Sequence, residues 1–311
     1  MKIRIRNIKS SIIKFTRRAT IRGFQGLPIY DVMSFFWKGL YDGALGLRAS
    51  AIAFNFFMAI FPTILFFFTL IPYIPINDFQ MSLFGLIQEV IPEKTYQAVS
   101  STLFDILTIP HSSLLSIGFL MALIFSTNGI HALIDSFNSS FHVVETRSWI
   151  RQRITAIFLV LILSVLVVLG IALLSFGTDV LKYLVKEGYL RGSFTFELIQ
   201  IGKWIVILLI FLFSYSFLYY MAPAKRKPFS FLSVGSILST VLTILFTFGF
   251  NYYIDRFSRY NALYGSIGTL MIFLLWLYFS AYVLLIGFEL NTSIYNAKLA
   301  RKEKHNIADK Q

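Results

Sequence analysis

The chain has 311 residues and no cysteine; 57% of its residues are hydrophobic, 14% are charged, and the formal net charge is +13. Soluble domains are usually about 45–50% apolar and about 25% charged, so this composition predicts a membrane protein and excludes an ordinary soluble enzyme domain. The absence of cysteine excludes disulfides, thiolate metal sites and a cysteine nucleophile, and it leaves the redox environment open.

The positive charge is unevenly distributed along the chain. If both ends and the segments 129–153 and 223–229 lie on the inner side of a membrane, that side carries 21 of the 28 Lys and Arg residues. Cytoplasmic loops of membrane proteins carry such an excess. The bias therefore explains the basic composition without a nucleic acid, and we expect membrane lipids rather than nucleic acid as partners.

Residues 1–48 predict a basic cytoplasmic tail followed by an amphipathic interfacial helix. No long apolar run follows the basic residues within about the first two dozen positions, so we expect no signal peptide. Polar and apolar residues then take opposite faces of a helix over 29–47: Asp31, Lys38 and Asp42 on one, and Val32, Met33, Phe36, Leu40 and Leu47 on the other. Such a helix is expected to lie in the headgroup plane.

Residues 49–290 predict an all-α transmembrane domain of six helices, because six apolar runs alternate with polar connections. The run 262–288 contains no charged residue and would rise about 40 Å at about 1.5 Å per residue, more than the roughly 30 Å hydrocarbon core of a bilayer. The expected spans are 49–73, 114–128, 154–176, 204–221, 229–254 and 262–288. Residues 291–311 predict a second basic cytoplasmic tail.

Three further local features are expected. Segment 74–111 contains prolines and predicts an outer loop with two short helices, 79–90 and 96–107, whereas 177–203 predicts a plain outer loop. The second span is expected to continue as a helix beyond residue 128. Small residues in the fifth span predict a stripe that packs closely on another helix: Gly235, Ser236, Ser239 and Thr240.

Two blocks of sequence carry a resemblance to a known family. The first comprises Tyr264-Gly265-Ser266-Ile267-Gly268, Leu275-Trp276-Leu277-Tyr278 and Leu285-Ile286-Gly287-Phe288-Glu289-Leu290-Asn291; the second is the small-residue and aromatic segment 51–65 with its Phe-Pro. Together they resemble the YihY/BrkB family of bacterial multi-pass inner-membrane proteins, once labelled ribonuclease BN. The resemblance implies a bacterial inner-membrane location and carries over no catalytic residue.

Five polar residues in or beside the apolar spans are candidates for a functional cavity. Asn128, His131 and Asp135 lie on one face of the second helix, Glu289 ends the sixth span, and Asn55 lies within the first. Because the second and sixth spans run in opposite directions, we expect these groups to contribute to one polar vestibule facing the cytoplasm, with Asn55 deeper in its wall. The alternative is that each group is separately hydrated at the membrane surface.

Motif analysis leaves two classes of function open. The sequence contains no P-loop, dinucleotide fingerprint, His-Glu-x-x-His or Gly-x-Ser-x-Gly motif, and its His and carboxylate residues form no closed metal-ligand set. We therefore expect no cofactor, no metal and no enzymatic activity, ribonuclease activity included. One class is a transporter or lipid-handling protein of the cell envelope, acting on a lipid or small solute. The other is a non-transporting envelope-assembly protein that docks partners through its basic tails.

The charge distribution generates a prediction of topology. Both termini and the turn around Lys227 should lie in the cytoplasm, because they carry the positive excess. Reporter fusions at Lys227 and at Gln311 should both give the cytoplasmic signal. A signal from the opposite side at either position would contradict the six-span topology.

Overall fold

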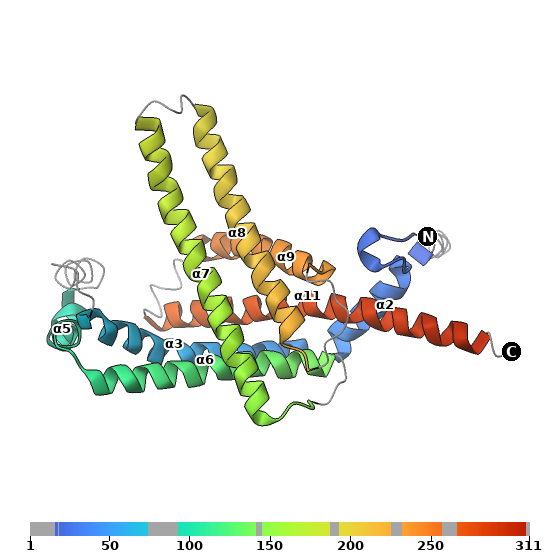
Figure 1. The fold of residues 1–311 in the computed structure, drawn as a ribbon, viewed down its shortest axis with the longest axis horizontal. Coiled ribbons are helices and arrows are strands. Elements are labelled where there is room, and N and C mark those ends of the chain that lie inside the picture. Colours follow the sequence, from blue (N-terminus) through green and yellow to red (C-terminus); the bar gives the residue numbers. More distant parts are fainter. Residues whose placement is uncertain are drawn as a thin grey trace. The chain divides into compact units, whose positions relative to one another are not determined.

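The computed structural model describes residues 16–17, 19–73, 93–140, 145–186, 193–224, 232–256 and 266–308 (Figure 1). Within these residues the fold is all-helical and contains no β-strand, as the sequence predicts. Six of the described helices are long and apolar enough to cross a membrane, which is the expected number. The chain is therefore a multi-pass helical membrane protein.

The spanning helices extend beyond the apolar runs that predict them. They are α3 (Leu45–Leu70), α6 (Ser112–Ser140), α7 (Trp149–Lys186), α8 (Ser193–Met221), α9 (Val234–Arg256) and α11 (Ser266–Ala308). The plain loop expected at 177–203 is wrong, because α7 continues to Lys186 and α8 begins at Ser193. Once a helix has formed, each further residue adds a hydrogen bond without a new nucleation step, so helices continue into polar flanks. For the same reason α6 continues past residue 128, as predicted.

Residues 54–129 form one compact unit, which contains most of α3, the first part of α6 and the segment between them. Of the two short helices expected in that segment, the second is present as α5 (Glu93–Thr108), which packs against the 3-10 turn Ile71–Tyr73. The first lies outside the described residues. Within this unit α3 and α6 approach closely, because Gly118 lies directly against the backbone of Phe66.

The remainder of the chain, 1–53 and 130–311, forms the second unit. Here α11 packs against α9 and against α2 (Ile29–Asp42), while α8 lies beside α7 and α9 (Figure 1). Its centre is a triad of buried aromatic side chains from three helices. The rings of Phe137 and Phe288 stack with centroids 3.9 Å apart, and the Tyr219 ring lies 5.6 Å and 5.5 Å from them.

The small-residue stripe of the fifth span packs on α11, as predicted. The hydroxyl of Tyr219 lies 2.6 Å from both Ser239 Oγ and the carbonyl oxygen of Leu284, so it joins α8, α9 and α11. One turn away, the backbone N–H of Gly235 donates to Asn291 Oδ1 at 2.8 Å. Small side chains let the two backbones approach closely enough for these hydrogen bonds.

The N-terminal helix differs from its prediction in two ways. It ends at Asp42 rather than continuing to residue 47, because Ala44 adopts a left-handed backbone conformation with a φ of 46° between α2 and α3. In addition, the apolar side chains of Val32 and Phe36 are buried in a cluster with α11 residues. The face expected to meet lipid headgroups is therefore occupied by protein. The interfacial position of α2 remains a prediction.

The contact between α9 and α11 generates a stability prediction. A Cβ atom on Gly287 would collide with Ser239 Oγ and lie 2.5 Å from the carbonyl oxygen of Gly235. Gly287→Ala should therefore destabilise the protein by about 1–3 kcal/mol, the usual range for overpacking, and lower its thermal unfolding midpoint in detergent. Gly249→Ala on α9 is the matched control, because nothing lies within 4 Å of its added Cβ. Equal midpoints for the two variants would contradict the close approach.

Candidate functional site

Two opposite charges lie within the membrane-spanning helices. The first, Arg48, follows the start of α3 by about one turn. Its Nη1 donates hydrogen bonds of 2.8 Å to the carbonyl oxygen of Ser136 and to Ser140 Oγ. Both acceptors lie at the C-terminal end of α6, where the helix dipole places partial negative charge. The guanidinium therefore stabilises the end of α6 and is held in place by it.

The second charge is Glu289 of α11, a residue that is only 5% exposed. It is electrostatically attracted to Arg48. Glycines at the C-terminal end of α2 provide the space for both groups. A Cβ on Gly39 would collide with the Glu289 carboxylate, and a Cβ on Gly43 would lie 2.6 Å from Arg48 Nη2. Gly39 lies in the last turn of α2 and Gly43 directly follows the helix, so the C-terminal end of α2 covers the two charged groups closely.

A pair of this kind has specific chemical possibilities. Glu289 is buried, so leaving its charge uncompensated would cost several kcal/mol, and the half-buried Arg48 supplies an opposite charge that attracts it. Ionisable groups inside membrane spans are rare and mark functional sites by default. The pair offers a cation for a phosphate or carboxylate and an anion for an amine, within one site.

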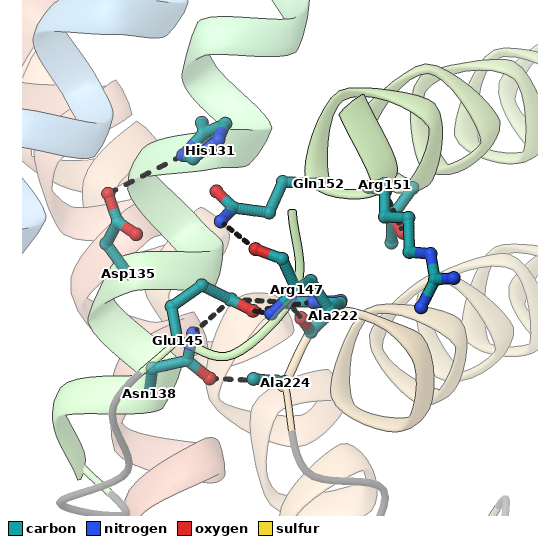
Figure 2. A network of polar contacts seen from close by, with 10 residues as sticks. His131, Asp135, Asn138, Glu145, Arg147, Arg151, Gln152, Ala222 and Ala224 are labelled. Carbon is teal, nitrogen blue, oxygen red and sulfur yellow. Dashed lines mark hydrogen bonds and ion pairs between the residues drawn. The ribbon is translucent and has the colours of Figure 1, made fainter. Parts of the chain in front are cut away.

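A second polar network joins the ends of three helices (Figure 2). Arg147 donates to Glu145 from its backbone N–H and Nε at 2.9 Å and from Nη2 at 2.8 Å, and Nη2 also donates to the carbonyl oxygen of Ala222 at 2.9 Å. Asn138 donates to Glu145 at 2.8 Å and accepts from the N–H of Ala224 at 2.8 Å. The network therefore ties the end of α6 and the start of α7 to the end of α8.

The carboxylate of Glu145 is the centre of that network. The side-chain hydrogen bonds from Arg147 hold the pKa of the Glu145 carboxyl at about 2, below its ordinary value of 4.5, although partial burial acts in the opposite direction. The group is therefore ionised at neutral pH. This fits a permanent structural clamp rather than a proton donor.

The structure divides the predicted vestibule residues between its two units. Asn55 and Asn128 are half-buried in the unit 54–129. His131, Asp135 and Glu289 belong to the other unit. His131 and Asp135 face each other on the same helix (Figure 2). Their Nδ1 and Oδ2 atoms lie 3.6 Å apart, and the Asp135 side chain is 66% exposed. The single vestibule formed by all five residues remains a prediction.

Sequence reasoning missed Arg48 and the clamp between Glu145 and Arg147. The sequence prediction includes Arg48 in the N-terminal segment 1–48, although it follows Gly43 and precedes a long apolar run without an intervening turn signal. This position next to the apolar run was the sequence signal that Arg48 belongs to the first spanning helix. The connection of the clamp to α8 had no such signal, because the hydrogen bonds of Arg147 with Ala222 and of Asn138 with Ala224 join residues that are distant in the sequence. Among the described residues, no group of three or more His, Asp or Glu side chains is placed to hold a metal ion.

The clamp predicts a defined pH dependence. Because the folded pKa of Glu145 is depressed, its ionised form stabilises the fold above about pH 4.5, and this contribution is lost as the pH falls towards about 2. Glu145→Gln should therefore unfold at a lower temperature than the wild type at neutral pH, and the gap should narrow below about pH 4.5. Glu303→Gln, which alters an exposed residue of α11, should have the unfolding temperature of the wild type at each pH. A gap that is independent of pH would contradict the ionised clamp.

Comparison with known proteins supports the family resemblance. The family described as virulence factor BrkB matches residues 36–311. A Bacillus subtilis (strain 168) protein named as ribonuclease-like, YfkH, is 29% identical over 252 residues, which cover 81% of this chain and 90% of the relative. No solved structure matches this chain significantly. Since the family match covers most of the chain and the fold has six spanning helices, the protein belongs to the BrkB family of membrane proteins.

Proposed function

We propose that this protein transports or redistributes a lipid or a small solute in the bacterial inner membrane, with both termini in the cytoplasm. The observation that carries the proposal is the attraction between the half-buried Arg48, in the first turn of α3, and the buried Glu289 of α11. Intramembrane charges face bundle interiors or cavities and commonly mark substrate pathways.

The chemistry of the pair favours a ligand that carries both charges. A molecule with an ammonium group and a phosphate could replace the attraction between Arg48 and Glu289 with its own two ion pairs, so neither charge would be left buried alone. Phosphatidylethanolamine headgroups and free phosphoethanolamine share this chemistry. The polar groups of His131 and Asp135, which belong to the same unit as Arg48 and Glu289, would line the route to the pair on the cytoplasmic side.

Vesicle assays test this function. Purified protein reconstituted into liposomes should accelerate the loss of acyl-chain-labelled phosphatidylethanolamine fluorescence on dithionite addition, or should accumulate radiolabelled phosphoethanolamine. The first result identifies a lipid substrate and the second a free solute. Glu289→Gln and Arg48→Lys should slow the active process at least about tenfold, equivalent to about 1.4 kcal/mol.

The matched control is Glu303→Gln, which removes an exposed carboxylate from the same helix, α11, and should retain the wild-type rate. Each variant should elute as a single species in detergent before it is assayed. Wild-type rates in both Glu289→Gln and Arg48→Lys would contradict a role for the pair. Protein that moves neither probe would favour the non-transporting envelope-assembly role.

The name of the Bacillus relative raises a second candidate, ribonuclease activity. Two His–Asp pairs of the described residues bear on such chemistry: His131 and Asp135 lie 3.6 Å apart on α6, and His111 and Asp105 lie 3.0 Å apart. Metal-dependent phosphodiester cleavage uses clustered ligands, so we expect purified protein with added Mg²⁺ or Mn²⁺ to leave RNA intact. Cleavage that copurifies with the protein and disappears in His131→Ala or Asp135→Ala would overturn this expectation.

A further inference from the structure

The α2 helix has a second exposed face that its packing on α11 does not use. At about 100° per residue, Tyr30, Trp37 and Tyr41 fall within an arc of about 40°. We call these three residues the aromatic stripe. Trp37 is 55% exposed and Tyr41 is 81% exposed, and their ring centroids lie 6.2 Å apart. Large, exposed aromatic side chains next to one another indicate a surface that binds something.

Two other faces border the aromatic stripe. On one side lie Val32 and Phe36, which are buried against α11. On the other lies a polar stripe that contains Asp31, Lys38 and Asp42. The helix therefore passes around its circumference from protein-covered, through aromatic, to charged. A helix at a membrane surface needs this order if one side is docked on its own protein.

The chain connection places this helix next to the bilayer. Only Gly43 and Ala44 separate the end of α2 from α3, the first membrane-spanning helix. Leu47, in the first turn of α3, is 75% exposed, as expected of a lipid-facing side chain. Trp and Tyr are enriched at the level of the headgroups, because their rings have an apolar body and a polar edge.

Charge near the stripe points to the same occupant. The first 48 residues contain ten Lys and Arg and only two acidic residues, Asp31 and Asp42. The guanidinium of Arg17 lies over the ring of Tyr30, 4.9 Å from its centroid, so a cation directly accompanies the stripe. Anionic headgroups attract such basic segments by about 1 kcal/mol per Lys or Arg near the surface.

We propose that the aromatic stripe inserts into the headgroup region of a bilayer that contains anionic lipid, while the polar stripe faces water. This assigns the lipid-binding role to the aromatic stripe rather than to the apolar face that hydrophobic periodicity suggests, since α11 covers residues of the latter. The inference is independent of transport. It requires only that α3 spans the membrane and that α2 packs on α11.

The absence of native cysteine allows a direct test. Nitroxide labels at Trp37→Cys and Tyr41→Cys report the aromatic stripe, and labels at Lys38→Cys and Asp42→Cys report the adjacent polar stripe. In nanodiscs of phosphatidylcholine and phosphatidylglycerol, labels 37 and 41 should be more accessible to oxygen than to a water-soluble nickel complex. Labels 38 and 42 should show the reverse order. All four sites are exposed in the structure, so the labels should not disturb folding.

Three results would overturn the proposal. Preferential accessibility to nickel at 37 and 41 would place the stripe in water. Protection of both from oxygen and nickel, with a short distance between labels at position 41 in two chains, would identify a second copy as the occupant. Protection from both reagents without a short distance between the labels at position 41 would identify a different protein as the occupant. A further check is phosphatidylcholine alone, in which the oxygen preference at 37 and 41 should decrease if anionic headgroups contribute.

Discussion

The attraction between Arg48 and Glu289 is the interaction on which the arrangement of the larger unit depends. The buried Glu289 of α11 would cost several kcal/mol without an opposite charge, and the half-buried Arg48 of α3 supplies one. Arg48 also binds the end of α6, and Gly39 of α2 and Gly43 directly after it leave the space for both charged groups. Four helices are therefore placed by one electrostatic requirement, and α2 is a structural part of the membrane domain.

Neutral contacts hold the rest of this unit together. Between helices in lipid the hydrophobic effect supplies little driving force, so association relies on close packing and hydrogen bonds. Both occur at the junction of α8, α9 and α11. There the Tyr219 hydroxyl forms hydrogen bonds with α9 and α11, and Gly287 lets the backbones of α9 and α11 approach closely. The clamp of Glu145 and Arg147 acts differently, because it lies outside the spans and joins helix ends through charge-assisted hydrogen bonds. A function that requires motion of α2 or α11 could therefore leave this clamp closed.

Sequence reasoning succeeded where the physical cause is local or set by lipid. The six spans, the extension of α6 and the packing stripe at Gly235 and Ser239 all follow from the periodicity and size of neighbouring side chains. It failed at 177–203, where helices continue into polar sequence, and at α2, where an apolar face meets α11 instead of lipid. In both places the residue pattern is compatible with two environments. It identified Glu289 as a candidate and missed its partner Arg48, which is 241 positions away.

The sequence by itself determined that this is a six-span helical membrane protein, because an apolar run of sufficient length has no other way to satisfy its backbone in lipid. It also determined the family, through short motifs of the sixth span. Only the tertiary structure decided which charges meet and which face of α2 is free. These depend on contacts between segments far apart in the chain, such as Gly39 with Glu289 and Val32 with the α11 cluster. Periodicity assigns a side chain to a face of its helix, whereas the neighbouring helix decides what that face contacts.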